Sequence, residues 1–314
     1  MKTHSGRAAA ILAIAAIGVA LTGCAATGPD TGAEGYTIGF ISGANNEWGS
    51  CLQGGVETEA DALGVELLVA NSDADAAKEV ANLEDMISRG VDAIVLNTVS
   101  VDALEGGIQK AKAAGIPLYL VAVVPKSLDD VMGATIVDLG AAGGLAAGWI
   151  GEDADGDDVT VAIIAGAPGA SSDYVVGGFR GALPANGTVV AEQPGMFNRG
   201  KAQEVAENII QANPGLDYAF VLNEDMAFGA RTAFAAAGRP DVKIVTMNGT
   251  QPGLQAIEDG GFAATVGDSA HDLGATSLEN AVALLDDPAG EKVFAMPIVL
   301  ITKDNLADAR PFCG

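Results

Sequence analysis

Uncharged amide side chains and one indole follow the strand-like segments of this sequence. The set comprises Asn45, Asn46, Trp48, Asn97, Asn223 and Asn248. An amide donates and accepts hydrogen bonds without carrying charge, and an indole offers a flat apolar face. At the ends of strands, these residue types favour the binding of a ligand. Asparagine is also a frequent turn and N-cap residue, and an indole can fill a core, so purely structural roles are the alternative.

The sequence offers few groups for bond-making chemistry. It has two histidines: His4 lies in an N-terminal export signal, and His271, in DSAHDLG, is expected at a helix start rather than as a general base. The glycine-rich runs GAAGGLAAG and IIAGAPGASS do not follow the first strand as a dinucleotide fingerprint would. The acidic loop EDADGDD is followed by Ile164 where a calcium loop needs Glu. We expect a protein that is not an enzyme, with no cofactor and no metal.

Strand-like and helix-like segments alternate from residue 36 onward, which is typical of βαβ units in a parallel sheet. The run VDAIVLN does not alternate between apolar and polar residues, which indicates a strand buried on both faces. The helix before it is expected to have Asp73 or Asp75 as its N-cap and Gly90 at its C-terminal cap.

The two halves of the chain contain similar segments. GVDAIVLN at 90–97 and AAGIPLYLV at 113–121 have counterparts in GLDYAFVLN at 215–223 and AAGRPDVKIV at 236–245, with a helix between the members of each pair. The repeat predicts an α/β fold of two similar open-sheet domains. Ligands bind such sheets at the carboxyl ends of the strands, which is where the amides are expected to lie.

The N-terminus has the pattern of a lipoprotein export signal. The run AAAILAIAAIGVA is uncharged and too short to span a bilayer comfortably. It leads into LTGC, which resembles the lipobox of bacterial lipoproteins. We expect a signal peptide at 1–23, lipid on Cys24 and a flexible tether at 24–35. The alternative is that Cys24 is an ordinary small residue and cleavage occurs elsewhere.

The exported part of the chain is strongly acidic. Of the 16 basic residues, Lys2 and Arg7 lie in the signal, which leaves 14 against 41 acidic residues, a formal charge of −27. Such a surface repels nucleic acid and anionic lipid head groups, so we expect no nucleic-acid partner and membrane attachment through lipid alone. Cys51 and Cys313 remain in a compartment that permits disulfides, and they form either one disulfide or two unpaired thiols.

From residue 37 to about residue 305 the sequence resembles the sugar-type solute-binding proteins of bacterial ABC importers, the ribose-binding type. The resemblance is carried by IGF…NNEWG, GVDAIVLN, AKAAGIP, VLNEDMAFGARTAFAAAG and VTMNGTQPGLQAIEDGGFAATV. It implies a type 1 periplasmic binding protein with two Rossmann-like, doubly wound parallel-sheet domains. These two lobes would close around a solute, with a three-segment hinge near Asp138, Asp268 and Ile298. The N-terminal lobe would take 36–138 plus 269–297, and the C-terminal lobe 139–268 plus 298–314.

The resemblance also implies a set of ligand-binding residues. The family's positions fall on Asn46, Trp48, Asn97, Phe197, Asn223 and Asn248. The family's Asp-Arg pair falls on Ala122 and Val123, its second-domain Arg near Asp173, and its hinge-side Gln on Asp268. Without those cations we do not expect charge-assisted binding of ribose. The carboxylates of Asp173 and Asp268 would need hydrogen-bond donors or a positive charge on the solute. A polyol or deoxy-sugar is therefore our first expectation, and an amine-bearing solute the second.

These inferences together predict a monomeric, lipid-anchored receptor on the outer face of the cell membrane. It would capture a small polar solute, with Trp48 stacking on the solute and the amides fixing its polar groups, and present it to an ABC permease. A sensory receptor of the same fold that reports to a membrane sensor is the alternative.

Overall fold

The structure is a computed structural model that describes residues 35–314. The expected signal peptide at 1–23, the lipidation site Cys24 and nearly all of the tether at 24–35 lie outside the described residues. Within the described range, no helix is long and apolar enough to cross a membrane.

The first of two six-stranded sheets has the order β11-β5-β4-β3-β1-β2, and its neighbouring strands are all parallel. Its strands are β1 (Thr37–Ser42), β2 (Glu66–Asn71), β3 (Ala93–Asn97), β4 (Leu118–Ala122), β5 (Gly133–Val137) and β11 (Val293–Met296).

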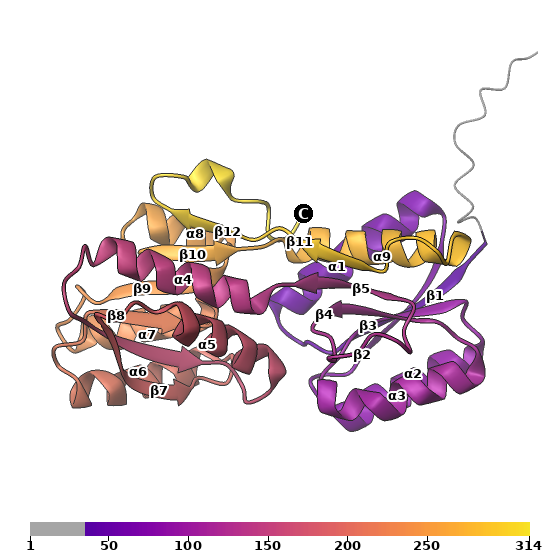
Figure 1. The fold of residues 1–314 in the computed structure, drawn as a ribbon, viewed down its shortest axis with the longest axis horizontal. Coiled ribbons are helices and arrows are strands. Elements are labelled where there is room, and N and C mark those ends of the chain that lie inside the picture. Colours follow the sequence, from indigo (N-terminus) through magenta and orange to yellow (C-terminus); the bar gives the residue numbers. More distant parts are fainter. Residues whose placement is uncertain (1–34) are drawn as a thin grey trace, which may run out of the picture. The chain divides into compact units, whose positions relative to one another are not determined.

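Helices cover both faces of this first sheet. The helices α1 (Glu47–Leu63) and α9 (Ala270–Asp286) pack against each other over one face, and α2 (Ala76–Arg89) and α3 (Val101–Ala114) pack against each other over the opposite face (Figure 1). The side chains of β3 alternate between the two cores, because successive residues of a strand point to opposite faces. All five residues of β3 are buried, which confirms the prediction from VDAIVLN.

The second sheet has the order β12-β10-β9-β8-β6-β7 and is parallel except for β12, which runs antiparallel to β10. Its strands are β6 (Val159–Ala165), β7 (Gly187–Pro194), β8 (Tyr218–Val221), β9 (Lys243–Asn248), β10 (Ala264–Gly267) and β12 (Val299–Thr302). The predicted α/β fold with doubly wound parallel sheets is therefore confirmed.

One continuous hydrophobic core surrounds the second sheet, and the rings of Phe179 and Phe220 stack within it at a centroid distance of 4.4 Å. Its helices are α4 (Leu139–Asp153), α5 (Ala170–Ala182), α6 (Arg199–Ala212), α7 (Glu224–Ala236) and α8 (Gln251–Glu258), followed near the C-terminus by the short 3-10 helix η1 (Leu306–Asp308). Among them α4 packs against α5 and α6 against α7.

Local sequence signals set the helix ends where they were expected. Asp75 is the N-cap of α2, and its side chain accepts hydrogen bonds from the backbone nitrogens of Ala77 and Lys78. Gly90 ends the same helix with a φ of 70°, a left-handed conformation that glycine adopts without strain.

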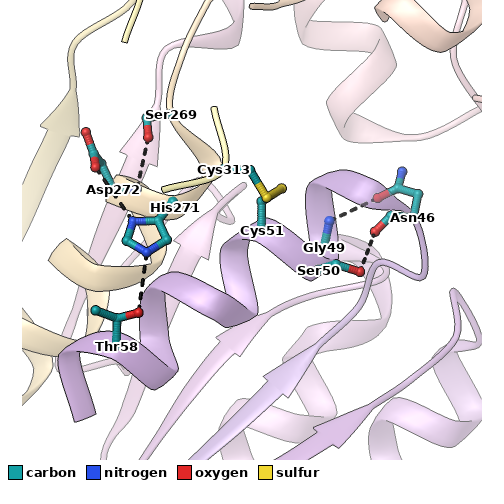
Figure 2. Close-up of a disulfide and its surroundings, with 9 residues drawn as sticks. All are labelled: Asn46, Gly49, Ser50, Cys51, Thr58, Ser269, His271, Asp272 and Cys313. Atoms are coloured by element: carbon teal, nitrogen blue, oxygen red, sulfur yellow. Dashed lines mark hydrogen bonds and ion pairs between the residues drawn. A yellow bond between two sulfur atoms is a disulfide. The ribbon is translucent and has the colours of Figure 1, made fainter. Parts of the chain in front are cut away.

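The chain passes between the two sheets at Asp138, at Asp268 and after Met296, since the elements on either side of these residues belong to different sheets. The last residues then return to the first sheet. Phe312 clusters with Cys51 and Ala270, and a disulfide joins Cys51 to Cys313 (Figure 2). Of the two states left open for these cysteines, the structure has the bonded one.

Candidate functional site

The carboxyl ends of β1, β3 and β4 place the first predicted amide. Asn97 ends β3 in register with Ser42 of β1. Its side chain is 94% buried, being 6% exposed, and its Nδ2 donates to the carbonyl oxygen of Val121 in β4 at 3.4 Å. This bond orients the amide at the sheet edge and leaves Oδ1 as the group that can accept from a solute.

Asn46 and Asn223 are both helix N-caps, so the structural alternative applies to each of them. Oδ1 of Asn46 accepts from the nitrogen of Gly49 at 3.1 Å at the start of α1 (Figure 2). Oδ1 of Asn223 accepts from the nitrogen of Met226 at 2.9 Å at the start of α7. Because capping occupies only the oxygen, each amide still has Nδ2 as a donor. Asn45 is exposed beside the first of these caps.

Trp48 lies in the first turn of α1 and is partly buried. It packs against the core shared by α1 and α9, and against the cluster of Cys51, Ala270 and Phe312. The indole therefore contributes to packing, in agreement with the alternative that it fills part of a core. The rest of the indole is exposed, and Trp48 is only two residues from Asn46 in the sequence. Stacking of the indole on a solute therefore stays a prediction.

Two predicted residues are neighbours at the end of the second sheet. Asn248 ends β9 in register with Gly267 of β10, and the nitrogen of Asp268 donates to the carbonyl oxygen of Asn248 at 3.2 Å. Burial raises the pKa of the Asp268 carboxyl to about 7, and the nearby Glu224 carboxylate adds to the rise. Near neutral pH this carboxyl can either accept or donate a hydrogen bond.

Phe197 follows β7 and packs its ring directly on Gly166 at the end of β6. A Cβ at position 166 would lie 2.0 Å from Cζ of Phe197, so only glycine leaves room for the ring. The side chain of Phe197 keeps a partly exposed surface. The aromatic residue expected from the resemblance is thus fixed at the carboxyl edge of the second sheet.

Asp173 lies exposed in the first turn of α5. The next residue, Tyr174, lines a pocket of about 390 Å³ with Ala122, Val123 and Asp138. The remaining lining residues are Val124, Ile136, Val137, Leu139 and Gly140. This pocket is largely apolar, and its lining includes Ala122 and Val123, on which the resemblance is expected to place the family's Asp-Arg pair.

A second pocket, of about 290 Å³, lies where the start of α8 meets the C-terminal segment. It is lined by Glu47, Gly249, Thr250, Gln251, Pro252, Leu254, Ala309, Arg310, Pro311, Phe312 and Cys313. Neither this pocket nor the first is lined by the predicted amides. The structure therefore places the predicted residues at strand ends of two sheets without collecting them in one of these pockets, and the ligand set stays a prediction.

Backbone strain marks the same strand ends. Of the seven non-glycine residues with positive φ in residues 35–314, six end or follow a strand: Asp73, Ala74, Ala122, Met196, Phe197 and Asn248. Such conformations cost about 1–3 kcal/mol each and persist where surrounding contacts hold them, commonly at ligand-binding sites. Phe197 (φ 51°) and Asn248 (φ 124°) are among the predicted ligand residues.

Two buried glutamates at these strand ends were not singled out from the sequence. Glu224 is 1% exposed and accepts hydrogen bonds from the loop after β9, and Glu79 is 4% exposed and accepts from the loop after β3. Burial raises the pKa of both carboxyls, while their hydrogen bonds oppose the rise. The only sequence signal was the position of Glu224 directly after Asn223.

The fold and these strand ends define the class of protein. Two mainly parallel sheets are connected by three passages of the chain. Both carry amides, aromatic rings and carboxyls at the carboxyl ends of their parallel strands, as a solute-binding protein requires. The chain belongs to the family described as the periplasmic binding protein domain, which matches residues 38–292.

Known relatives agree with this assignment. The chain is 34% identical over 257 residues to the ribose import binding protein RbsB of Salmonella typhimurium, covering 81% of this chain and 85% of that protein. It is 30% identical over 311 residues to the xylitol-binding protein of Mycolicibacterium smegmatis, covering 95% and 86%. The solved periplasmic binding protein component of the arabinose ABC transporter from Shewanella sp. ANA-3, bound to α- and β-L-arabinofuranose, has a TM-score of 0.81 at 26% identity, covering 86% of this chain and 93% of that chain.

Proposed function

We propose that this protein captures a sugar or polyol and delivers it to an ABC permease. The observation that carries the proposal is the combination of groups at the strand ends: Nδ2 donors of Asn46 and Asn223, and acceptors from Asn97 and Asp268. A hydroxyl group both donates and accepts, so a mixture of uncharged donors and acceptors suits a solute with many hydroxyls. Relatives named for ribose and xylitol binding support the same solute class.

Within that class we favour a polyol or deoxy-sugar over ribose. By the resemblance, Ala122 and Val123 take the places of the Asp-Arg pair of the ribose-binding type, and both line a largely apolar pocket. Apolar lining suits carbon-bound hydrogens rather than the hydroxyls that a guanidinium would hold. An amine-bearing solute is the second candidate, because Asp173 and Asp268 could balance its charge.

Solute binding would drive closure of two lobes, since the solute touches both sets of strand ends only when they approach one another. The residues expected to act from the first sheet are Asn45, Asn46, Trp48 and Asn97. Those expected from the second are Asp173, Phe197, Asn223, Asn248 and Asp268. No step of this cycle forms or breaks a covalent bond.

We further propose that the protein works outside the cytoplasm as a lipid-anchored monomer. The apolar run before LTGC and the cysteine at position 24 support export and lipidation. The full chain expressed in a bacterial host should fractionate with the membrane, and Cys24→Ala should move it to the soluble exported fraction. A wild-type chain found entirely in the soluble fraction would contradict the anchor.

A thermal-shift panel tests the solute class. The probes are D-ribose, xylitol, L-arabinose, myo-inositol and, as the amine, putrescine. A ligand that binds only the native state at 100 times its Kd stabilises it by about 2.7 kcal/mol, so a hit should raise the Tm by roughly 5 °C or more. A shift with xylitol or another hydroxylated probe supports the proposal, and a shift with putrescine alone favours the amine. No shift with any probe at 10 mM contradicts both.

A further inference from the structure

Glu224 is a buried carboxylate whose two oxygens both accept hydrogen bonds. Oε1 accepts from the nitrogen of Gly249 at 2.9 Å and from Oγ1 of Thr265 at 2.8 Å. Oε2 accepts from the nitrogen of Thr250 at 2.8 Å and from the hydroxyl of the same threonine. Donors on both oxygens favour the ionised form, even though burial raises the pKa of this carboxyl. The side chain therefore ties α7 to the loop after β9 and to β10.

The direction of the threonine bond follows from its other partner. Oγ1 of Thr250 accepts from the nitrogen of Gly253 at 3.1 Å and caps α8, so its hydrogen is directed to Glu224. The carboxylate also lies hard against Gly253, where a Cβ would be 2.1 Å from Cδ of Glu224. The start of α8 is thus shaped around this carboxylate.

The segment held in this way begins with a predicted ligand residue. Asn248 has a φ of 124°, and Gly249 follows with a φ of 80°. For a non-glycine residue this conformation costs about 1–3 kcal/mol and needs surrounding contacts to hold it. The bonds from Gly249 and Thr250 to Glu224 are such contacts, and Asn223, the residue before Glu224, is a second predicted ligand residue.

The first sheet has a comparable arrangement of a buried glutamate and a loop. Its occurrence in both sheets argues against a chance result of core packing at Glu224. Oε1 of Glu79, on α2, accepts from Oγ1 of Thr98 at 2.8 Å, and Oε2 accepts from the nitrogen of Val99 at 2.5 Å. Thr98 and Val99 directly follow Asn97. In each sheet, therefore, a buried glutamate uses both oxygens to hold a loop that begins with a predicted ligand amide.

We propose that Glu224 is a positioning residue for solute recognition, which fixes Asn248 and Asn223 in their binding orientation without touching the solute. The inference rests on the proposed function, because it assigns a role in the same site. It predicts that the loss of acceptor atoms at position 224 weakens solute binding more than it weakens the fold.

The test compares Glu224→Gln with Asp225→Asn in the exported chain. Glutamine keeps the volume but replaces one acceptor oxygen with an NH₂ group that faces the donors of the loop. The neighbour Asp225 is exposed and pairs with Arg199 at 2.8 Å, so Asp225→Asn changes the same charge without touching the loop. Each protein is titrated calorimetrically with xylitol, D-ribose, L-arabinose and myo-inositol, and its unfolding in urea is measured without solute.

We expect Glu224→Gln to weaken binding of the probe that wild type binds by at least about tenfold, which corresponds to one charged hydrogen bond. Hydrogen exchange at the Gly249 and Thr250 amides should become faster in the same variant. Asp225→Asn should match wild type in solute affinity and in the hydrogen exchange of these two amides. Equal affinity of Glu224→Gln and wild type, even with a lower urea midpoint, would show a purely structural residue and overturn the inference.

A second variant keeps the inference testable if Glu224→Gln does not fold. Thr265→Val keeps nearly the same shape and removes one donor to Oε1, so we expect a loss of about threefold in affinity. Unchanged affinity in Thr265→Val, with Glu224→Gln unfolded, would also overturn the inference. A wild-type chain that binds none of these four hydroxylated probes overturns the proposed function and the inference together, whereas wild-type binding with equal binding by the variants overturns the inference alone.

Discussion

The ring of Phe197 lies on the backbone of Gly166, so close that a Cβ at position 166 would be 2.0 Å from Cζ of the ring. Gly166 follows β6, and its nitrogen donates to Oγ of Ser172 at 3.1 Å, which fixes the turn into α5. The glycine therefore serves as a platform that sets where the aromatic ring lies at the strand ends.

Gly166→Ala should displace the ring of Phe197. We expect a loss of about 1–3 kcal/mol in the free energy of unfolding, as for other overpacked sites, together with weaker binding of the solute found in the thermal-shift panel. Urea unfolding and calorimetric titration measure the two effects. Gly177→Ala is the matched control, because a Cβ there meets nothing within 4 Å and alanine should stabilise α5 by roughly 0.5–1 kcal/mol. Wild-type stability and affinity in Gly166→Ala would contradict the platform role.

The pKa of about 7 for Asp268 predicts a pH dependence of stability. The unfolded value is near 3.8, so the contribution of this group is fully present below about pH 4 and is lost as the pH rises through 7. Wild type should therefore lose stability relative to Asp268→Asn between pH 5 and pH 8. Melting temperatures of both proteins in one buffer series check this, and parallel curves would show that the carboxyl titrates in the ordinary acidic range.

The disulfide between Cys51 and Cys313 closes a loop across a sequence separation of 262 residues. Removing such a bond typically costs about 2–5 kcal/mol, so Cys313→Ser should lower the free energy of unfolding by that amount. Cys313 is the better position for this substitution, because its side chain is exposed. Cys51 is 1% exposed, so a substitution there would also lose packing contacts.

A reducing agent should lower the Tm of wild type toward that of Cys313→Ser and leave the variant unchanged. Two thiols titratable in unfolded, unreduced wild type would instead mean that the cysteines are unpaired. Two hydrogen bonds of the C-terminal segment do not depend on the disulfide and should remain after reduction. The backbone nitrogen of His271 donates to the carbonyl oxygen of Phe312 at 3.2 Å, and Nη1 of Arg310 donates to Oδ2 of Asp272 at 3.2 Å.

Substitutions at Trp48 separate packing from binding. The indole contacts two hydrophobic clusters, so Trp48→Ala should cost roughly 1–3 kcal/mol of stability, less than a fully buried tryptophan. It should also remove the thermal shift caused by the solute. Trp48→Phe keeps an aromatic face and should retain most of the stability and a measurable shift. If Trp48→Ala binds the solute as wild type does, the indole is a core residue only.

Much of the fold could be read from local patterns. The unbroken apolar run of β3 predicted a strand buried on both faces, and Asp75 and Gly90 predicted the two ends of α2. Because parallel strands end at one edge of a sheet, the sequence alone predicted that the amides Asn97 and Asn248 lie at strand ends. The use of Asn46 and Asn223 as helix N-caps, by contrast, had been only an alternative.

The sequence by itself determined the alternation of strands and helices, the repeated halves and the chemical kinds of side chain at the strand ends, because periodicity and capping act between residues close together in the chain. Only the tertiary structure decided that Glu224 binds the loop at Gly249, that Phe197 rests on Gly166, that the carboxyl of Asp268 is desolvated and that Cys51 meets Cys313. Each of these depends on which distant segments pack together and on how much water that packing removes. Local sequence patterns determine neither the packing of distant segments nor the removal of water from a side chain.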